Sequence, residues 1–549
     1  MTFRFDSFRI DEDRREIWRG AALLQVEPRI FDLLLYLVRH SDRVVTKDEL
    51  QDEVWGTVVT EAAVARGIMK ARKLLGDTTD HPRYLKTIRG SGYRFIGASA
   101  EAPSETAPLL ARDRRSIAVL PFANMSGNDE NRYFSDGIAE EVLNLLAKLP
   151  ELRVSSRTSS FCFRDSALDL RSIAGKLNVD YVLEGSVRRD GSRVRITVQL
   201  IDARDDAHVM SEAFEREVVD IFRLQADIAT QVVARLQLAT EAMNNAPRDT
   251  VSLQAYEHYL RGRHYFHLFD GKSMDYSKLM YRKAIELDST FAKAWAGLAE
   301  SLTVVWMWQS NDPAVLEEAR SASRRAVELA PELAESRCAR GFVLSLQGDY
   351  VAAAAEFETS IALDPMLYEA WYLYGRSRFA EGVPAEAARL FRTAAAVRPD
   401  EYQAMNLAAT ALRRLGEHDA MLAASAEGVR RCRQRLALRP DDTRALTLGA
   451  GSLVDLGERE EAIVWLERAL DIRPNDIGVM HNCGCVYAAL GEVDRALDLF
   501  ERRFALGNAF ADWIDNDPDF DGLREHPRFK AIRRTAAAGE RAMPTPDAG

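Results

Sequence analysis

The spacing of apolar residues in TEAAVARGIMKARKLLGD, residues 60–77, predicts an amphipathic helix with a basic outer face. Apolar side chains recur at intervals of three and four residues, at Val64, Ile68, Ala71 and Leu75. At 100° per residue these positions form one stripe, and the cations Arg66, Lys70 and Lys73 lie almost opposite it. A solvated surface helix would also carry such a face. The neighbouring elements decide between a solvated surface and a binding surface.

Patterns on both sides of this helix predict a small α+β domain over residues 1–98. FRFDSFRI and REIWRG alternate apolar and polar residues and predict short strands. PRIFDLLLYLV begins with a proline suited to a first helical turn, and TKDELQDEVW places Thr46 three residues before Glu49, as in a capping box. RYLKTI and YRFI flank the glycine-rich RGSG and predict a hairpin. Three helices closed by a basic hairpin form a winged helix-turn-helix, whose third helix enters the major groove of DNA.

The distribution of charge supports a binding surface in this domain. Residues 66–94 hold eight basic and two acidic residues, whereas residues 1–65 hold nine basic and thirteen acidic residues. The whole chain has a net charge of −11, so any nucleic-acid surface must be local. A positive edge on a near-neutral domain is the footprint expected of phosphate binding.

Three segments, VTKDELQDEVWG, VARGIMKARKLLGD and YLKTIRGSGYRF, follow one another as in the OmpR/PhoB-type winged-helix transcriptional regulators, which this domain resembles. The last segment contains the Thr-x-x-Gly-x-Gly-Tyr wing of that family. The resemblance implies base contact from Lys70, phosphate contact from Arg72, backbone contact from Thr87 and minor-groove insertion of Arg89. It also implies that the loop GTVVT touches RNA polymerase. Domains of this family bind direct repeats of double-stranded DNA as pairs, which implies a homodimer on DNA.

Helix geometry adds two candidates to this set. Arg66 lies one turn from Lys70 and is a second candidate for base contact, and Lys73 completes the basic stripe. Arg72 flanks the apolar face, where the alternative to a phosphate contact is an ion pair inside the domain. Gly67 costs about 1 kcal/mol relative to alanine in a helix interior. It either allows close approach to a phosphate or is tolerated without a role.

Residues 99–115 are rich in Ala, Pro, Ser and Glu and predict a flexible linker. The chain has no run of about 18 apolar residues, and its first residues lack the apolar region of a signal peptide. Its five cysteines are scattered, which indicates free thiols in a reducing compartment. We therefore expect a cytoplasmic protein without membrane contact. No aspartate can be assigned as a phosphoacceptor, so control by phosphorylation is not expected.

Residues 116–245 predict a small α/β sandwich with the order βαβαβββα. SDGIAEEVLNLLAKL and DLRSIAGKLN predict helices capped by Ser135 and Asp169, and YVLEGSVRR and SRVRITVQLID flank an Asp-Gly turn. The segments VLPF, YFSDGIAEEV, YVLEGSV and VQLID resemble the TolB amino-terminal-like module. Asp136 and Glu140 lie one turn apart and could share a ligand, although the helix dipole favours carboxylates at any helix start. The pattern does not choose between binding of a small molecule and dimerisation.

Residues 246–510 repeat with a 34-residue period and resemble tetratricopeptide repeats, which predicts an all-α superhelix. Seven units begin near residues 255, 292, 334, 368, 402, 443 and 477, and the second and fifth are lengthened. The concave groove of such an array suits a protein or peptide ligand. The residues at groove-facing spacing are Glu369, Tyr372, Arg376, Asn406, Arg413 and His481. The alternative is a solvated inner surface.

The remaining features of the array carry no predicted chemistry. Cys483 and Cys485 point about 200° apart on one helix and cannot easily share a metal ion, so no metal and no cofactor are expected. WMW at residues 306–308 is either additional core or an exposed contact. Residues 511–549 predict a capping helix and a tail without structure.

These patterns predict a multidomain, sequence-specific DNA-binding transcriptional regulator. The winged helix would hold a promoter, and the repeat array would receive a protein or peptide signal. One alternative is a protein-interaction scaffold in which the winged helix contacts proteins. The other is a regulatory subunit of an enzyme, although no catalytic constellation is present and an enzyme is not expected.

Overall fold

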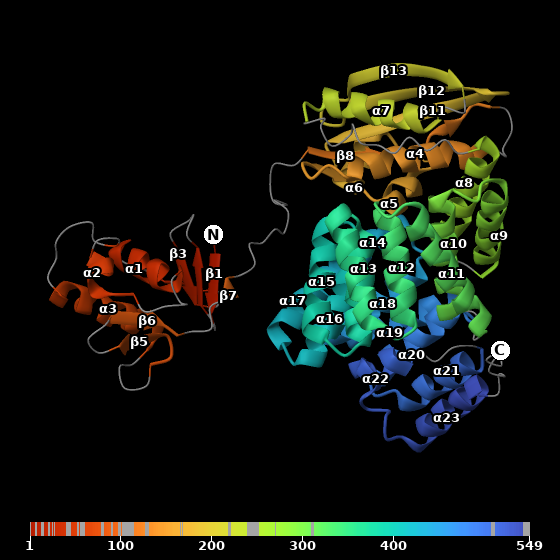
Figure 1. The fold of residues 1–549 in the computed structure, drawn as a ribbon. Helices are drawn as coiled ribbons and strands as arrows, with labels where there is room; N and C mark the ends of the chain where they lie inside the picture. The colour runs from red at the N-terminus through yellow and green to blue at the C-terminus, as the bar shows by residue number, and fades with distance from the viewer. Residues whose placement is uncertain are drawn as a thin grey trace. The chain divides into compact units, whose positions relative to one another are not determined.

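The computed structural model describes residues 2–101 and 115–541 with interruptions. The positions left out within these ranges are 6–7, 12–15, 20–21, 25, 27, 40–44, 52–53, 55–60, 78–81, 89–91, 97–99, 127–130, 165, 167, 218–220, 239–251, 269–270, 309–311 and 507–510. The chain folds as two compact units, Met1–Leu109 and Leu110–Gly549, whose ribbons are drawn in Figure 1.

The described part of the first unit has the α+β composition predicted for a winged helix. One antiparallel sheet has the strand order β4-β3-β2-β1-β7, and β5 pairs with β6 as a separate hairpin. The strands are β1 (Thr2–Phe5), β2 (Phe8–Asp11), β3 (Glu16–Arg19), β4 (Ala22–Leu24), β5 (Leu85–Ile88), β6 (Gly92–Phe95) and β7 (Ala100–Glu101). The helices are α1 (Pro28–Arg39), α2 (Lys47–Leu50) and α3 (Glu61–Leu75). Strand β7 lies in residues predicted as linker.

One apolar core joins the elements of this unit. Phe31 of α1, Ile68 of α3, and Leu85 and Phe95 of the hairpin are each no more than 1% exposed and belong to the same cluster. The backbone N–H of Glu49 donates to Thr46 Oγ1 at 3.2 Å, which confirms one half of the predicted capping box. The alternating and helical periods of the sequence therefore place the basic helix and the hairpin on a common core.

The middle module begins the second unit and contains one mixed sheet. Its strand order is β10-β8-β11-β12-β13, and β9 pairs with β11. The strands are β8 (Arg115–Val119), β9 (Ala123–Asn124), β10 (Leu152–Val154), β11 (Tyr181–Asp190), β12 (Arg193–Asp202) and β13 (Ala207–Glu217). The helices are α4 (Arg132–Ala147), α5 (Arg157–Ser160), the 3-10 turn η3 (Phe161–Phe163), α6 (Leu170–Leu177) and α7 (Ile221–Arg235). The two strands β11 and β12 meet at the predicted Asp-Gly turn, with Asp190 opposite Arg193.

Two details of the predicted module are wrong. Ser135 does not cap a helix, because α4 begins one turn earlier at Arg132 and Ser135 Oγ instead donates to the carbonyl of Asn131 at 3.4 Å. The predicted order also lacks β9, α5 and η3, which are too short to show a period. The cap at Asp169 is confirmed, since its carboxylate accepts from the backbone N–H of Ser172 at 2.7 Å.

The helices described in the repeat array form seven pairs. The pairs are α8 (Leu253–Leu268) and α9 (Gly271–Leu287), α10 (Ala292–Trp308) and α11 (Pro313–Leu329), α12 (Ala334–Leu346) and α13 (Tyr350–Leu363), α14 (Tyr368–Ala380) and α15 (Pro384–Val397), α16 (Gln403–Leu415) and α17 (His418–Leu438), α18 (Thr443–Asp455) and α19 (Arg459–Ile472), and α20 (Ile477–Ala489) and α21 (Val493–Leu506). The first helix of every pair begins within two residues of its predicted position. Successive first helices such as α10, α12 and α14 contact one another and form the inner side of the array.

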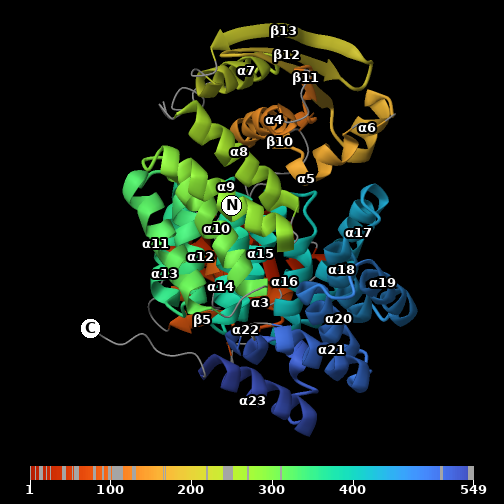
Figure 2. The same cartoon turned by 90° about the vertical axis from the view of Figure 1, so that its right-hand side faces the viewer.

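The middle module and the array share one core. Phe134 and Ile138 of α4 lie in the same apolar cluster as Tyr256 and Leu260 of α8, and both ribbon views show these two helices side by side (Figures 1 and 2). Figure 2 also shows the sheet covering α4 on the side away from the array. The module is therefore fixed to the first repeat by packing.

The two carboxylates of α4 considered as ligand contacts lie inside this junction. Glu140 accepts from Arg157 at 2.8 Å and from Arg263 at 2.6 Å, and its Oε1 lies 2.9 Å from His267 Nε2. Asp136 forms an ion pair with Arg164. Because both carboxylates are satisfied by protein cations and are under 5% exposed, the proposed ligand role is replaced by a structural one.

The chain ends in α22 (Ala511–Asn516), the 3-10 turn η6 (Pro518–Phe520) and α23 (Pro527–Arg541). Helix α23 packs on α21, as expected of a capping helix, whereas α22 contacts α14 and η6 contacts α16 and α20. Helix α23 continues to Arg541, so the first residues of the tail predicted to lack structure are helical. Residues 542–549 lie outside the described residues.

Candidate nucleic-acid interface

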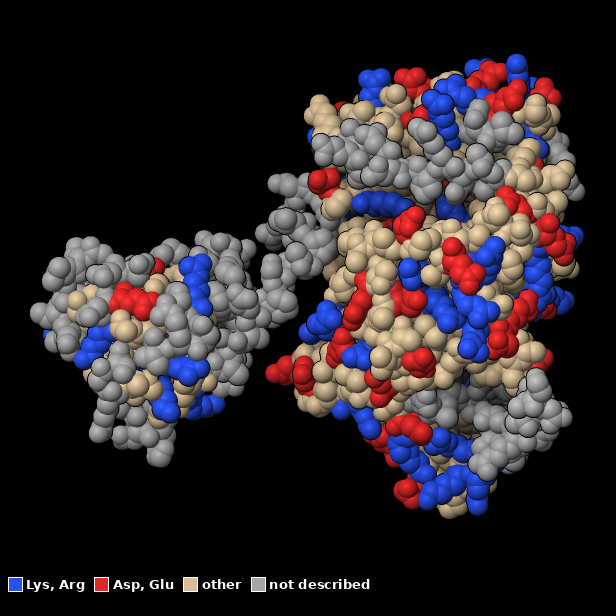
Figure 3. Space-filling model, viewed as in Figure 1, with Lys and Arg blue, Asp and Glu red and all other residues tan. Residues whose placement is uncertain are grey.

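Helix α3 has the two opposed faces that its sequence predicts. Val64, Ile68, Ala71 and Leu75 are at most 2% exposed, whereas Arg66, Lys70 and Lys73 are exposed. Figure 3 shows Lys and Arg side chains on the side of the first unit that carries α3 and the hairpin. The helix therefore presents cations in a row without a carboxylate among them.

Gly67 lies on the buried side of α3. This position is incompatible with the hypothesis that Gly67 allows a phosphate to approach, because the exposed cations are on the other side of the helix. The glycine belongs to the packing of α3 against the core.

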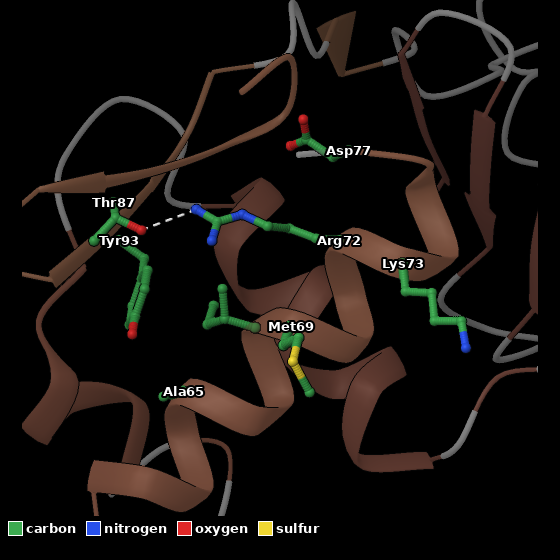
Figure 4. A pocket seen from close by; sticks show the side chains of 8 residues that line it. Ala65, Met69, Arg72, Lys73, Asp77, Thr87 and Tyr93 are labelled. Atoms are coloured by element: carbon green, nitrogen blue, oxygen red, sulfur yellow. Dashed lines mark hydrogen bonds between the residues drawn. The ribbon is translucent and has the colours of Figure 1, made fainter. Parts of the chain in front are cut away.

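Met69 is an exposed apolar residue of α3 that the pattern of charges does not indicate. Its side chain is 62% exposed, although it is large and apolar. It stands next to Lys70, at the edge of an open depression of about 420 Å³ between α3 and the hairpin. Residues lining this depression include Ala65, Met69, Lys73, Thr87 and Tyr93 (Figure 4). An exposed methionine within a basic surface can contact the methyl group of a thymine.

Arg72 does not stand free as a phosphate contact. Its side chain is buried, and its Nη2 donates to the carbonyl of Leu85 at 2.8 Å and to Thr87 Oγ1 at 2.9 Å; Figure 4 shows the latter bond. The expected phosphate contact is therefore corrected to a structural role, in which Arg72 ties the hairpin to α3. The alternative of a role inside the domain fits this geometry better than a phosphate contact does.

Asp77 provides a second tie between the helix and the hairpin. The α3 helix ends at Leu75, and the buried carboxylate of Asp77 accepts from the backbone N–H groups of Arg83, Tyr84 and Leu85 at 2.7, 3.0 and 2.8 Å. Three donors on one carboxylate fix where β5 begins relative to α3. The sequence showed Asp77 only as a charge that offsets the cations.

The wing is the hairpin formed by β5 and β6, and its base requires a glycine at position 92. Tyr93 and Val45 exchange two backbone hydrogen bonds of 2.8 and 2.9 Å. Gly92 has φ +147°, and a Cβ atom there would lie 2.0 Å from the carbonyl oxygen of Val45. The Gly-Tyr of the wing motif is thus explained by the close approach of two backbones.

Some predicted contacts lie outside the described residues. Thr87 is exposed and accepts from Arg72, but Arg89 at the wing tip and the loop GTVVT at residues 56–60 are not described. Of the candidate contacts that the structure describes, Arg66, Lys70 and Lys73 are exposed on α3 and Thr87 is exposed on β5.

The residues predicted to face the groove of the array have partners within the chain. Glu369 pairs with Arg398 at 2.8 Å, Tyr372 is 7% exposed, and Arg376 lies over the ring of Trp513 at 5.1 Å. Arg413 pairs with Asp455 at 2.9 Å and with Asp519. Trp513 and Asp519 belong to the C-terminal segment, which therefore covers part of the inner side.

Two of the predicted groove positions are wrong. Asn406 is 4% exposed, donates to the carbonyl of Tyr402 at 2.8 Å and accepts from Ser452 Oγ at 2.6 Å, so it is a core residue. His481 is 5% exposed and lies among the rings of Trp308, Phe500 and Phe520. WMW, which contains Trp308, thus contributes mainly to the core.

One group of potential metal ligands occurs among the described residues. Cys485, Asp517 and Asp519 have ligand atoms within 4.8 Å of one another. Asp517 already accepts from the N–H groups of Asp519 and Trp513 at 3.0 Å each, and Asp519 pairs with Arg413. Because the carboxylates are engaged with donors and a cation, this group does not fit a metal ion.

Comparison with known proteins agrees with this arrangement. Residues 21–95 match the family described as "Transcriptional regulatory protein, C terminal", residues 113–231 match the "HilA/YgeH-like transcriptional regulator, second domain", and residues 445–476 match a tetratricopeptide repeat. The chain thus carries an OmpR/PhoB-type DNA-binding domain, a HilA-type second domain and tetratricopeptide repeats, which is the domain composition of a transcriptional regulator. The likeness of the middle module to TolB receives no support from these matches.

Three relatives show the extent of the similarity. The transcriptional regulator HilA of Salmonella typhi is 22% identical over 398 residues, 70% of this chain and 68% of that protein. The transcriptional activator CadC of Escherichia coli is 39% identical over 83 residues, 15% of this chain and 16% of that protein. A Rhizobium meliloti protein with a provisional adenylate cyclase name is 36% identical over 218 residues, 39% of this chain and 37% of that protein.

None of the helices that the structure describes combines the length and the apolar character needed to cross a membrane.

Proposed function

We propose that the chain binds promoter DNA in a sequence-specific manner and regulates transcription. The observation that carries this proposal is the row of exposed cations on α3, Arg66, Lys70 and Lys73, opposite a fully buried apolar stripe. In this role α3 lies in the major groove, Arg66 and Lys70 contact bases, and Met69 contacts an apolar base edge. Lys73 and Thr87 contact the phosphate backbone, with Arg89 of the wing tip in the adjacent minor groove.

The remaining partners follow from the same proposal. The loop at residues 56–60 contacts RNA polymerase, and two copies bind direct repeats on DNA. The array receives a protein or peptide signal, for which Arg376, Arg413 and Glu369 are retained as contacts, whereas Tyr372 lies in the core like Asn406 and His481. We place the protein in the cytoplasm.

We further propose that regulation involves no catalysis by this chain. Similarity to the HilA and CadC regulators supports this view. The relative with a cyclase name is matched over 37% of its length. Most of that protein therefore has no counterpart in the match, and its name is no reason to assign a cyclase reaction to this chain.

The test is selection of bound fragments from sheared genomic DNA with the full chain, followed by titration of affinity against salt. Enrichment of a short repeated motif with steeply salt-dependent affinity supports the proposal. Lys70→Ala should weaken and broaden the selected motif, whereas Arg324→Ala, which removes an exposed cation from the array, should change neither. Recovery of random fragments by the unaltered chain would favour a scaffold.

A further inference from the structure

The C-terminal segment reaches a part of the array that a capping element does not need to touch. A cap must cover only the last repeat, and α23 does so by packing on α21. Residues 511–521 instead contact α14 and α16, where bonded residues lie 136 and 106 positions earlier in the chain, as well as α20. In Figure 1 the α22 part of this segment lies at the lower end of the array, near α20.

The first part of the segment binds the C-terminal end of α14. The ring of Trp513 lies 4.6 Å from that of Phe379, and the guanidinium of Arg376 lies over the indole at 5.1 Å. Asn516 Nδ2 donates to the carbonyl of Ala380 at 2.8 Å. This amide therefore satisfies a carbonyl at a helix end, a group that usually requires a partner.

The second part binds α16 and α20. Asp519 forms an ion pair with Arg413, and Asp521 forms one with Arg414 at 3.1 Å. Phe520 is fully buried, and its ring lies 5.9 Å from His481 and 5.1 Å from Phe500. The segment thus combines carboxylates facing cations with an aromatic ring in an aromatic pocket.

We propose that the surface formed by α14, α16 and α20 binds short acidic peptides that carry aromatic residues, and that residues 511–521 occupy this surface until such a peptide displaces them. The sequence of the segment, DWIDNDPDFD, supplies five aspartates, a tryptophan and a phenylalanine within ten residues. The array supplies three arginines, Arg376, Arg413 and Arg414, from two inner helices.

The bound segment defines the chemistry of the partner. A competing peptide needs an aromatic side chain that contacts Phe379 and Arg376, as Trp513 does. Three residues later it needs a hydrogen-bond donor in the place of Asn516. Three residues after that donor it needs an acidic residue, directly followed by an aromatic residue, in the places of Asp519 and Phe520. A purely basic or purely apolar peptide lacks the carboxylates that meet Arg413 and Arg414. This inference rests on the proposed role of the array as receiver of a peptide signal, and it names the class of signal and the element that competes with it.

The test uses a fluorescein-labelled synthetic peptide with the sequence of residues 510–522, FADWIDNDPDFDG, and the full chain. The tethered segment competes with the added peptide at an effective concentration of about millimolar. Binding measured by fluorescence anisotropy should therefore be at least about tenfold tighter to the variant Trp513→Ala/Asp519→Asn than to the unaltered chain. A peptide that carries the same two changes should bind that variant at least about tenfold more weakly than the original peptide.

Asp515→Asn in the chain is the matched control, because the carboxylate of Asp515 is 54% exposed and pairs with Arg533 of α23 rather than with α14, α16 or α20. The proposal would be overturned if the peptide bound the variant Trp513→Ala/Asp519→Asn and the unaltered chain with equal affinity. It would also be overturned if a scrambled acidic peptide bound that variant as tightly as the original peptide does. If the double variant does not fold, hydrogen exchange of residues 513–520 in the unaltered chain replaces it. Saturating peptide should then speed exchange in this segment, and unchanged protection would refute displacement.

DNA binding is measured on the same samples. If the peptide does not bind and DNA binding is intact, only the proposal that α14, α16 and α20 recognise such peptides is refuted. Absence of DNA binding with intact peptide competition refutes only the proposed role as a DNA-binding regulator.

Discussion

Replacement of Gly92 by alanine should disrupt the base of the wing. The added Cβ would lie 2.0 Å from the carbonyl oxygen of Val45 and 2.9 Å from Thr46 Cα, and both neighbours are backbone atoms that cannot rotate away. The φ angle of +147° adds strain, because side chains other than glycine rarely adopt it. The chain must therefore move β6 away from residue 45.

The expected magnitude follows from the contacts that would be lost. Backbone strain of this kind costs about 1–3 kcal/mol. The two hydrogen bonds between Val45 and Tyr93 are worth about 0.5–1.5 kcal/mol each. Together these effects give a destabilisation of about 2–6 kcal/mol, which is a large part of the stability of about 5–15 kcal/mol typical of a domain.

Gly76→Ala is the matched control, since Gly76 also has a positive φ of +65° but no atom lies within 4 Å of the position that its Cβ would occupy. It should cost only the strain of a left-handed residue, about 1–2 kcal/mol. Hydrogen exchange of peptides containing Val45 and Tyr93, together with thermal unfolding of the full chain, measures both variants. The steric reasoning is refuted if Gly92→Ala is no more disruptive than Gly76→Ala.

Three further predictions concern single side chains. Lys70→Ala should weaken operator binding and broaden sequence preference by about 1–3 kcal/mol per lost base contact, as measured by competition between operator variants; unchanged preference would count against α3 as the reading element. Arg72→Ala should lower the free energy of unfolding by about 1–3 kcal/mol, because the bonds to Leu85 and Thr87 are lost. The salt dependence of DNA binding should not change. A slope of log affinity against log salt reduced by about one would instead indicate that Arg72 contacts a phosphate. Burial, with Arg503 and Arg376 nearby, lowers the pKa of His481 from 6.5 to about 3. The unfolded chain takes up this proton as pH falls below about 6.5 and the folded chain does not, so His481 should cost about 2 kcal/mol of stability between pH 7 and pH 5. Urea unfolding of His481→Phe at both pH values should show an acid-induced loss smaller by that amount, and an equal loss would contradict the buried neutral imidazole.

The sequence predicted the elements of this fold where a period persisted over several turns or strands. The stripe from Val64 to Leu75 located α3, and the 34-residue repeat located the first helix of every pair. Short elements such as β9 and α5 carried no such period. Ser135 failed as a cap because α4 already begins at Arg132, which places Phe134 inside the helix and in the core.

The candidate interface was predictable only in its outward residues. Arg66, Lys70 and Lys73 are exposed, and helical geometry alone indicates that. The roles of Arg72 and Asp77 depend on β5 and the two residues before it, which provide their partners. A helical wheel places Arg72 beside the apolar face, but it contains no information about the hairpin and so does not identify the partners of Arg72.

The same limit explains the charged residues of the second unit. Glu140 looked like a helix-start carboxylate with a free face, yet its partners Arg263 and His267 come from α8, more than a hundred residues later. Burial would raise the pKa of Glu140, but His267 and Arg263 hold it well below its ordinary value. Separation of the module from the array would remove Arg263 and His267 from this buried carboxylate and leave Arg157 as its partner. The middle module and the first repeat are therefore joined by this buried charge network as well as by their common apolar core.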